Sequence, residues 1–413
     1  ASQLYRLLSM DRNLGLGATH HVPNGGIVSK AACQGLIPGV ESTGLSGATY
    51  WYDGQILDAA RLLLDCLSDA AAQGAVAANY VEATGFLGDA QQVQGVRAVD
   101  RLTGAEIELQ ARLTVNTCGP WIDKLLHKGL ELRRDGMTGL SKCMNLVTRP
   151  LTEDHAFGVR SSRASDALLG RERRMFFFTP WQDRTVIGTS HLPYQGDPDT
   201  CRYTEQDVAE FLEEINAAYP RARLKLNDVD YCYGGLTPAE EESAASGEVA
   251  RARRSAVLDH RESHGVDGLM SAVGVKWTTS RLVAENLVDQ VMTRLGRPGV
   301  SCRLHEAPLP GAKRAAAPEP SLPDLCRNAV EEDMARHLSD LVFRRTSLSH
   351  RGAFDDSMLV QSAAVMAEEL GWDSTEQARE LDTVRSDGRW HLGKPQPSPQ
   401  SRDIDRIEPR RSY

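Results

Sequence analysis

The feature that most constrains the fold of this chain is an apolar run, a glycine turn and a helix within residues 268–296. Residues 269–273 form a short, mainly apolar run between two glycines, which is typical of a buried strand. Thr278 and Thr279 stand where a helix N-cap belongs, and Gly296 stops the helix. The apolar residues that follow the turn recur on one helical face: Leu282, Val283, Leu287, Val288, Val291, Met292 and Leu295. Because a helix N-terminus offers N–H groups and a partial positive charge, this turn suits an anion, or a ring that becomes anionic on reduction.

The composition is that of a globular protein. A length of 413 residues, with 41% hydrophobic and 25% charged residues, predicts two or three domains with ample core. The net charge of −9 argues against a nucleic-acid partner. No run of 18 apolar residues and no signal-peptide pattern is present, so neither a membrane span nor secretion is expected. The eight cysteines lack metal-ligand spacing, which predicts reduced thiols in the cytoplasm and no metal site.

Periodicity and turn residues predict both helices and strands along the chain. Helices are expected at residues 4–10, 58–74, 204–218, 325–343, 356–370 and 375–385, with a further short helix capped by Ser29. Strands are expected at residues 75–86, 93–99, 105–115, 140–147, 156–161, 175–180, 185–189 and 229–233, with a hairpin at Gln182-Asp183. Residues 297–323 are rich in proline and alanine and predict a linker, and the tail from Lys394 is expected to be disordered.

Several stretches together resemble one enzyme family. They are Tyr52-Asp53 with Asp58-Ala-Ala-Arg-Leu62, Val115-Asn-Thr-Cys-Gly-Pro-Trp-Ile-Asp123, Thr179-Pro-Trp181 with Ile187-Gly-Thr189, Arg254 with Leu258-Asp259, Gly274-Val-Lys-Trp-Thr-Thr-Ser-Arg281, and the segment from Arg344 to Trp372. In this order they resemble the FAD-dependent, quinone-linked glycerol-3-phosphate dehydrogenases of the D-amino-acid-oxidase-like superfamily. The resemblance covers about residues 49–372.

The resemblance implies an α/β fold with α+β elements, in which a two-domain FAD-binding unit precedes an all-α domain. The expected divisions are residues 1–132 (remainder of the FAD-binding domain), 133–254 (mixed antiparallel substrate-domain sheet), 255–300 (return to the FAD-binding domain), 301–322 (linker), 323–390 (C-terminal helical domain) and 391–413 (disordered tail). Proteins of this family hold the FAD pyrophosphate with a strand–GxGxxG–helix unit. The sequence Gly15-Leu-Gly17 lacks the third glycine of this motif. The N-terminal Rossmann βαβ unit is therefore expected to be missing, and the chain is expected to bind FAD poorly by itself. The alternative is a protein that never had this unit.

The resemblance also implies a cofactor site for FAD. Its residues would be Ala83, Thr117, Gly119, Trp121, Gly274, Lys276, Trp277, Thr278 and Thr279. Lys276 would act in catalysis by holding negative charge that develops on flavin or substrate. From the residues alone, the segment at Thr117 is equally an ordinary strand-to-helix turn, Lys276 an exposed loop lysine, and the two threonines simple helix caps.

The substrate site departs from the family pattern at two positions. Asn145 stands where the family commonly has a histidine that is the presumed base, and an amide cannot act as a base at neutral pH. Thr237 stands where the family has an arginine, so one substrate-binding cation is absent. Arg254 is the expected phosphate ligand, because a guanidinium binds phosphate through two hydrogen bonds. The alternative places Arg254 in a solvated basic patch.

Two histidines are candidates for the missing base. His260 is assigned as catalytic, because a histidine titrates near neutrality. A surface or structural role is the alternative for His260, and His191 carries the same ambiguity.

The function implied by the resemblance is oxidation of glycerol 3-phosphate, or of a related secondary alcohol, to the ketone, with hydride transfer to flavin N5 and electrons passed to quinone. The first alternative is an FAD-dependent amine or 2-hydroxy-acid oxidase, and the second is a non-catalytic fragment. The expected partners are a small phosphorylated substrate and quinone, with a homodimer as a further expectation. The expected location is the cytoplasm, with contact at the inner face of the membrane that is peripheral at most.

Overall fold

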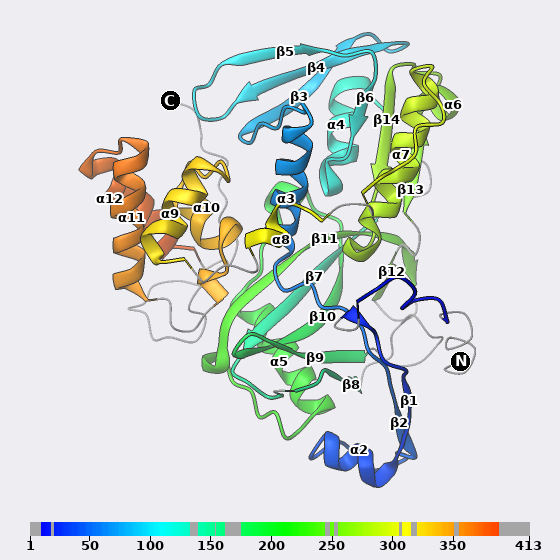
Figure 1. The fold of residues 1–413 in the computed structure, drawn as a ribbon, viewed down its shortest axis with the longest axis vertical. Coiled ribbons are helices and arrows are strands. Elements are labelled where there is room, and N and C mark those ends of the chain that lie inside the picture. The colour runs from blue at the N-terminus through cyan, green and yellow to red at the C-terminus, as the bar shows by residue number, and fades with distance from the viewer. Residues whose placement is uncertain are drawn as a thin grey trace.

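The architecture combines antiparallel and parallel strand pairs with packed helices (Figure 1). The computed structural model describes residues 10–17, 20–132, 139–152, 154–161, 175–243, 248–251, 255–304, 308–314, 320–350 and 355–387. Within these ranges the strands form one six-stranded sheet, two three-stranded sheets and one two-stranded sheet. The mixed α/β content, the large antiparallel sheet and the helices near the C-terminus confirm the predicted fold class.

The largest sheet is antiparallel and has the strand order β12-β11-β7-β10-β9-β8. Its strands are β7 (Gly139–Thr148), β8 (Phe157–Arg160), β9 (Met175–Trp181), β10 (Arg184–Tyr194), β11 (Val229–Ser243) and β12 (Glu248–Arg251). Helix α5 (Glu205–Ala218) starts where the Thr204 hydroxyl accepts a hydrogen bond from the Asp207 amide. Phe211 and Ile215 of α5 belong to the same buried core as Leu146 of β7, so α5 covers one face of this sheet.

Two three-stranded sheets form the other β-layer. One is an antiparallel meander of β3 (Val81–Gly88), β4 (Val93–Asp100) and β5 (Glu106–Gln110). The other places β14 (Leu269–Val273) between β13 (Ala256–Asp259) and β6 (Thr114–Asn116). One core cluster, with Phe86, Ile122, Leu126 and Leu269 among its members, joins both sheets to α4. The helical elements of this region are η2 (Gly119–Trp121), α4 (Ile122–Leu130), α6 (His260–His264), η5 (Trp277–Thr279) and α7 (Ser280–Arg294).

The N-terminal part forms a two-stranded arm and a long helix. Strands β1 (Gly26–Ser29) and β2 (Gly47–Tyr50) pair antiparallel, and α2 (Lys30–Leu36) lies at the end of the arm (Figure 1). Ser29 caps α2, as predicted, and Asp58 caps α3 (Ala59–Ala72), which lies within the helix predicted at residues 58–74. The two four-residue strands of the arm were not predicted, because runs this short carry little alternation.

The C-terminal helices gather on one side of the molecule (Figure 1). They are α9 (Leu322–Glu331), α10 (Leu338–Asp340), the π-helical η6 (Leu341–Arg345), the short η7 (Leu348–His350), α11 (Asp356–Leu370) and α12 (Ser374–Arg385). The short α8 (Gly311–Arg314) lies apart from them, beside α3 (Figure 1). Their own core contains Cys326, Leu338, Leu341, Leu359 and Met366. Among the described residues, no helix is both long enough and apolar enough to cross a lipid bilayer.

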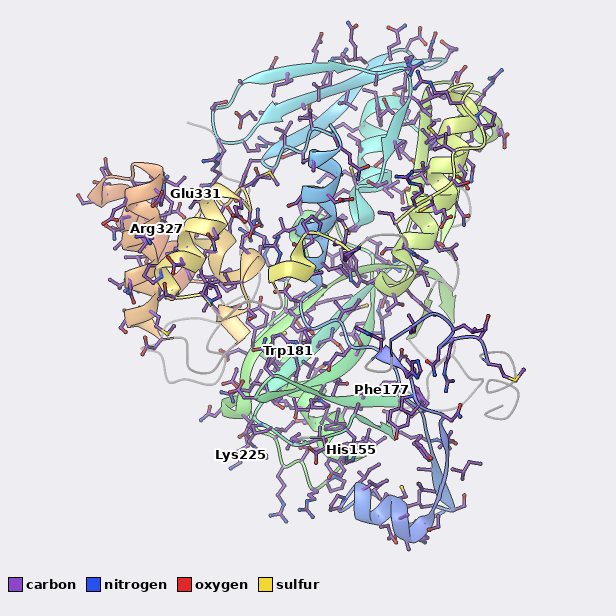
Figure 2. All side chains as sticks on the ribbon, in the orientation of Figure 1. His155, Phe177, Trp181, Lys225, Arg327 and Glu331 are labelled. Atoms are coloured by element: carbon purple, nitrogen blue, oxygen red, sulfur yellow. The ribbon has the colours of Figure 1, made fainter. Side chains whose placement is uncertain are left out.

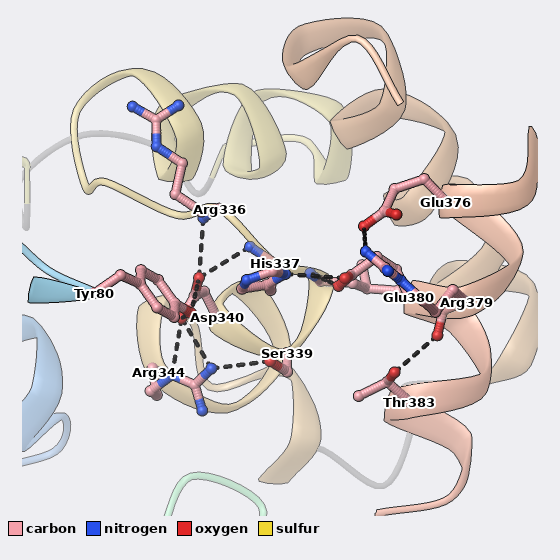
Figure 3. Close-up of polar contacts among 11 residues, drawn as sticks. Tyr80, Arg336, His337, Ser339, Asp340, Arg344, Glu376, Arg379, Glu380 and Thr383 are labelled. Carbon is pink, nitrogen blue, oxygen red and sulfur yellow. Dashed lines mark hydrogen bonds and ion pairs between the residues drawn. The ribbon is translucent and has the colours of Figure 1, made fainter. Parts of the chain in front are cut away.

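A buried carboxylate attaches these helices to the rest of the chain (Figure 3). Asp340 is 2% exposed, and its carboxylate accepts a hydrogen bond from the Tyr80 hydroxyl, which lies 2.8 Å from Oδ1 and 2.7 Å from Oδ2. It also accepts from the amides of Arg336 and His337 and from Arg344 Nε. Burial acts to raise the pKa of Asp340, but the charge of Arg344 and these donors outweigh it and hold the pKa below its usual range.

Three predicted elements differ from the structure. The single strand predicted at residues 105–115 is wrong: the segment forms β5 and β6, which pair with β4 and β14 in different sheets. The single helix predicted at residues 325–343 is also wrong, because Met334 adopts a φ of 59° and separates α9 from α10. The residues predicted as a linker include α8 and the start of α9.

The apolar face predicted for α7 is only partly buried. Leu287 is 9% exposed, whereas Leu282 and Val288 are 59% and 52% exposed. Helical periodicity identifies the face correctly, but burial also needs a neighbouring element. The core at Leu287 receives side chains from β13, from β14 and from Leu113 just before β6. The predicted helix at residues 4–10, apart from Met10, and the predicted disordered tail lie outside the described residues.

Candidate active site at the ends of two parallel strands

Two turns predicted to hold the cofactor lie at the same edge of one sheet. Strands β6 and β14 are parallel neighbours, with Thr114 opposite Leu269 and Asn116 opposite Ser271. Both strands therefore end at the same edge, where residues 117–121 follow β6 and residues 274–279 follow β14. In sheets with parallel strands, ligands bind outside the carboxyl ends of the strands. The structure thus brings together two motifs that are about 150 residues apart in the sequence.

The first turn is fixed by the side chain of Asn116, which is 3% exposed. Its Oδ1 accepts a hydrogen bond from the Cys118 amide at 3.2 Å, and its Nδ2 donates to the Ile122 carbonyl at 3.4 Å. Gly119 has a φ of 58°, in the left-handed region that favours glycine. The Trp121 side chain donates from Nε1 to Asp199 at 2.6 Å. Asn116 was not among the predicted site residues, although it stands in the same motif.

The second turn presents a cation and an aromatic ring to solvent. Gly274, Lys276, Trp277, Thr278 and Thr279 are all exposed. The Thr279 hydroxyl donates to the Lys276 carbonyl at 3.1 Å and makes no capping hydrogen bond to α7, although Thr279 occupies the N-cap position. The prediction that this threonine caps the helix through its side chain is therefore wrong, because its hydroxyl is used inside the turn.

His260 lies inside the protein rather than beside these turns. Its side chain is 0% exposed, and Nε2 lies 2.8 Å from the Ser271 hydroxyl on β14. Its Nδ1 lies 3.2 Å from Nδ1 of His264. Burial, together with the nearby His264, lowers the pKa of His260 to about 4, while Asp259 acts to raise it. A ring that is enclosed and hydrogen-bonded at both nitrogens fits a structural role better than proton transfer from a substrate.

The large sheet turns an aromatic and polar face away from α5. Phe177, Gly188, Asn145 and Tyr233 stand directly opposite one another on β9, β10, β7 and β11. Opposed residues of antiparallel strands project to the same face. Phe177 (marked in Figure 2) and Tyr233 are 41% and 38% exposed. Asn145 Oδ1 accepts a hydrogen bond from the Thr189 hydroxyl at 3.0 Å.

The next rows of this face hold a thiol, an imidazole and two hydroxyls. His191 stands opposite Cys143, and Thr237 stands opposite Ser141. Cys143 Sγ lies 3.0 Å from His191 Nδ1 and 3.2 Å from Thr237 Oγ1. The predicted substrate residues Asn145 and Thr237 thus share one face. Cys143 and Thr189 were not predicted, but the two-residue alternation along β7 places Cys143 on the face of Asn145.

The first turn also borders this sheet, since η2 packs against β11. Ala83 lies elsewhere, on β3, where its side chain packs against the core around Phe86 and Ile122. Arg254 lies outside the described residues. Among the described residues, no group of three or more His, Cys, Asp or Glu side chains gathers to hold a metal.

The two turns fit a cofactor that has an aromatic ring and takes up negative charge. A Cβ atom placed on Gly119 or Gly274 would meet no heavy atom within 4 Å, so space is open beside both turns. No side chain at the N-cap position of α7 satisfies its first amides, which leaves this helix end suited to an acceptor from outside. Lys276 adds a positive charge next to it.

The fold and these turns define a flavin-dependent oxidoreductase. The chain belongs to the DAO family of FAD-dependent oxidoreductases, whose family model matches residues 3–290. FAD is the cofactor of this family. The predicted family and the predicted cofactor are both confirmed.

Individual proteins of similar sequence give a closer comparison than the family model does. A glycerol-3-phosphate dehydrogenase of Synechocystis sp. is 29% identical over 345 residues, which are 81% of this chain and 59% of that protein. An alpha-glycerophosphate oxidase of Lactococcus lactis is 30% identical over 205 residues, covering 49% of this chain and 32% of that protein. The chain therefore spans about three fifths of the first of these relatives and about a third of the second.

A solved structure shares the fold. The glycerol-3-phosphate dehydrogenase from Bacillus halodurans, solved as a complex with FAD, superposes with a TM-score of 0.66 at 23% sequence identity. The match covers 92% of this chain and 80% of that one. At 23% sequence identity, this structural similarity supports the fold alone.

Proposed function

We propose that this chain forms part of an enzyme that oxidises glycerol 3-phosphate, or a related secondary alcohol, to the ketone. The observation that carries the proposal is the meeting of residues 117–121 and 274–279 at one sheet edge, beside the polar face of β7, β10 and β11. The names of the relatives support the substrate class. FAD, when bound, would supply the hydride acceptor.

The residues of the two turns and of the sheet face would then have separate tasks. Lys276 would hold negative charge that develops near the turn, and the N-terminus of α7 would add to the same potential. Asn145, fixed by Thr189, would orient the substrate by hydrogen bonding. The phosphate-binding role of Arg254 and the cofactor contacts of Ala83 and Trp121 are part of this proposal.

The electron acceptor, the cellular location and the oligomeric state of the enzyme are proposals as well. We infer a quinone acceptor and a cytoplasmic protein whose contact with the membrane is peripheral at most, together with a homodimeric assembly. The domain divisions predicted from the sequence belong to the same proposal. The separate cores of the α5-covered sheet and of the C-terminal helices support the proposed division between these two parts. Cys33 and Ile37, from the range proposed for the FAD-binding domain, pack in the core of the α5-covered sheet.

A second candidate is oxidation of an amine or a 2-hydroxy acid. The observation that favours it is the neutral character of the row Phe177, Gly188, Asn145 and Tyr233, together with Thr237 in place of an arginine. A face with hydroxyl, amide and aromatic groups binds a compact polar substrate without needing a phosphate.

Anaerobic reduction of the flavin tests both candidates. The full chain is incubated with saturating FAD, and glycerol 3-phosphate, glycerol, glycine or a 2-hydroxy acid is added while the flavin absorbance is followed. We expect bleaching with glycerol 3-phosphate. Bleaching with glycine or the hydroxy acid alone would overturn the first candidate in favour of the second.

The contribution of Lys276 is tested in the same assay. Lys276→Ala should slow bleaching by about tenfold or more, because one lost charge interaction of about 1.4 kcal/mol in the transition state has this effect. Lys128→Ala, at an exposed lysine of α4, is the matched control and should leave the rate unchanged. Equal rates for the two variants would remove Lys276 from the proposed mechanism.

A further inference from the structure

Cys143 and His191 form a thiol–imidazole pair on the sheet face that turns away from α5. They stand directly opposite each other on β7 and β10, and Sγ lies 3.0 Å from Nδ1. A neighbouring imidazole that takes the thiol proton leaves a thiolate, which is the nucleophilic form of cysteine. The pair is formed by backbone register, so the contact does not depend on a loop.

Two hydroxyl groups complete the surroundings of the sulfur. Thr237 Oγ1 lies 3.2 Å from Sγ, and Ser141 Oγ lies 3.7 Å from Sγ and 3.3 Å from His191 Nδ1. The Thr237 hydroxyl can donate to the sulfur, and such a donor favours the charged thiolate. The Ser141 carbonyl and the Ser141 hydroxyl, at 3.5 and 3.7 Å, accept from the thiol and favour its neutral form, but both contacts are longer than those of the imidazole and of Thr237.

A small molecule has a route to this sulfur. Cys143 is only 6% exposed, but Gly235 stands directly opposite it on β11 and is exposed. A Cβ atom placed on Gly235 would meet no heavy atom within 4 Å, so space is open next to the thiol on the same face. Tyr233, in the adjoining row, is 38% exposed. The opening is therefore suited to a reagent of a few atoms.

We propose that Cys143 is a modification site for peroxides, with His191 as the acceptor of the thiol proton. The thiolate sulfur attacks one peroxide oxygen, the O–O bond breaks, and the leaving hydroxide takes the proton from His191 to become water. The sulfur is oxidised by two electrons to a sulfenic acid, and the peroxide is reduced by two electrons. The site requires neither bound FAD nor the proposed substrate.

The test measures which cysteines react with hydrogen peroxide. The full chain is treated at neutral pH, sulfenic acids are trapped with a cyclic dione, and the labelled peptides are quantified by mass spectrometry. Cys66 is the internal control, because partial burial and the carboxylates of Asp65 and Asp69 raise the pKa of its thiol. We expect Cys143 to be labelled about tenfold faster than Cys66, although Cys66 is the more exposed residue.

Two variants separate the role of the imidazole from general accessibility. His191→Asn should slow labelling of Cys143 about tenfold and leave Cys66 unchanged. Gly235→Val should also slow Cys143 by filling the open space, and an unchanged rate for Cys66 would show that the fold is retained. Labelling of Cys143 no faster than that of Cys66, or labelling unaffected by His191→Asn, would overturn the proposal.

Discussion

At the scale of single residues, burial decides what a histidine can do. His260 and His191 look alike in the sequence, as two histidines near segments of the predicted site. His260 is enclosed and bound to Ser271, whereas His191 is half-buried on the face that carries Cys143 and Asn145. The residue assigned as a base therefore stabilises β14 from inside. His191, by contrast, belongs to a cluster of polar side chains on a sheet face.

The pKa of His260 predicts a loss of stability in acid. This pKa is about 4 in the folded chain, below the ordinary value of 6.5, so between these values the unfolded chain binds more protons. The free energy of unfolding should be highest above about pH 6.5 and should fall as the pH drops toward 4, by on the order of 3 kcal/mol from this residue. Urea unfolding across this range measures the effect.

A variant isolates the contribution of this ring from other acid effects. His260→Gln cannot titrate, so its free energy of unfolding should depend less on pH between 6.5 and 4. His155→Gln, at an exposed histidine marked in Figure 2, is the control and should keep the slope of the parent protein. Identical slopes for the two variants would show that His260 is not the titrating group.

At the scale of elements, one side chain holds the turn between β6 and α4. Asn116 binds the amide of Cys118 and the carbonyl of Ile122, so it shapes the turn from the strand side. An amide suits this role, because its oxygen accepts and its nitrogen donates from two separate atoms of one short side chain.

Replacing Asn116 should loosen the turn. Asn116→Ala leaves the Cys118 amide and the Ile122 carbonyl without this partner, which should cost about 0.5–1.5 kcal/mol in the free energy of unfolding. Asn116→Asp keeps the acceptor and loses the donor, and it should speed hydrogen exchange at Cys118 less than alanine does. Exchange at Cys118 that is equal in the parent protein and in Asn116→Ala would contradict this account.

At the scale of the whole molecule, polar contacts join the C-terminal helices to α3 and to the residues just before β3. The Arg61 side chain on α3 reaches Asp333 at 2.5 Å, Asn79 Nδ2 donates to the Met334 carbonyl at 2.7 Å, and Tyr80 binds Asp340. These contacts come from residues just before β3 and from one face of α3. The helical domain is therefore anchored on the side of the molecule that carries β3.

The anchor at Asp340 should show a graded response to substitution. Tyr80→Phe removes one hydrogen bond to a carboxylate and should cost about 2 kcal/mol. Asp340→Ala also leaves Arg344 unpaired near a buried site and should cost about 3–5 kcal/mol. Tyr194→Phe is the control, because Tyr194 is a half-buried tyrosine whose hydroxyl donates to the Asp197 carbonyl at the surface, with less than about 0.5 kcal/mol expected. Similar losses for all three variants in urea unfolding would show that Asp340 is no special anchor.

The local structure of this chain could be predicted from the sequence because it depends on neighbours in the chain. Ser29 caps a helix as predicted, and the helices predicted from residues 58 and 204 begin at capping side chains of Asp58 and Thr204, because such a cap joins a side chain to an amide only three residues away. The hairpin at residues 182–183 follows from turn chemistry in the same way. The resemblance of motifs then identified the cofactor and the family.

The pairing of distant segments was decided only by the tertiary structure. Residues 105–115 have the alternation of one strand but divide between two sheets, because alternation does not specify which strand lies alongside. In the same way, the contact of Cys143 with His191 depends on register between two strands that are far apart in the sequence. The enclosure of His260 depends on how β14 and the surrounding elements pack around it. The sequence alone determined which residue types were available at the site. The packing of the sheets determined which of them meet, because burial and contact depend on all the neighbours in space.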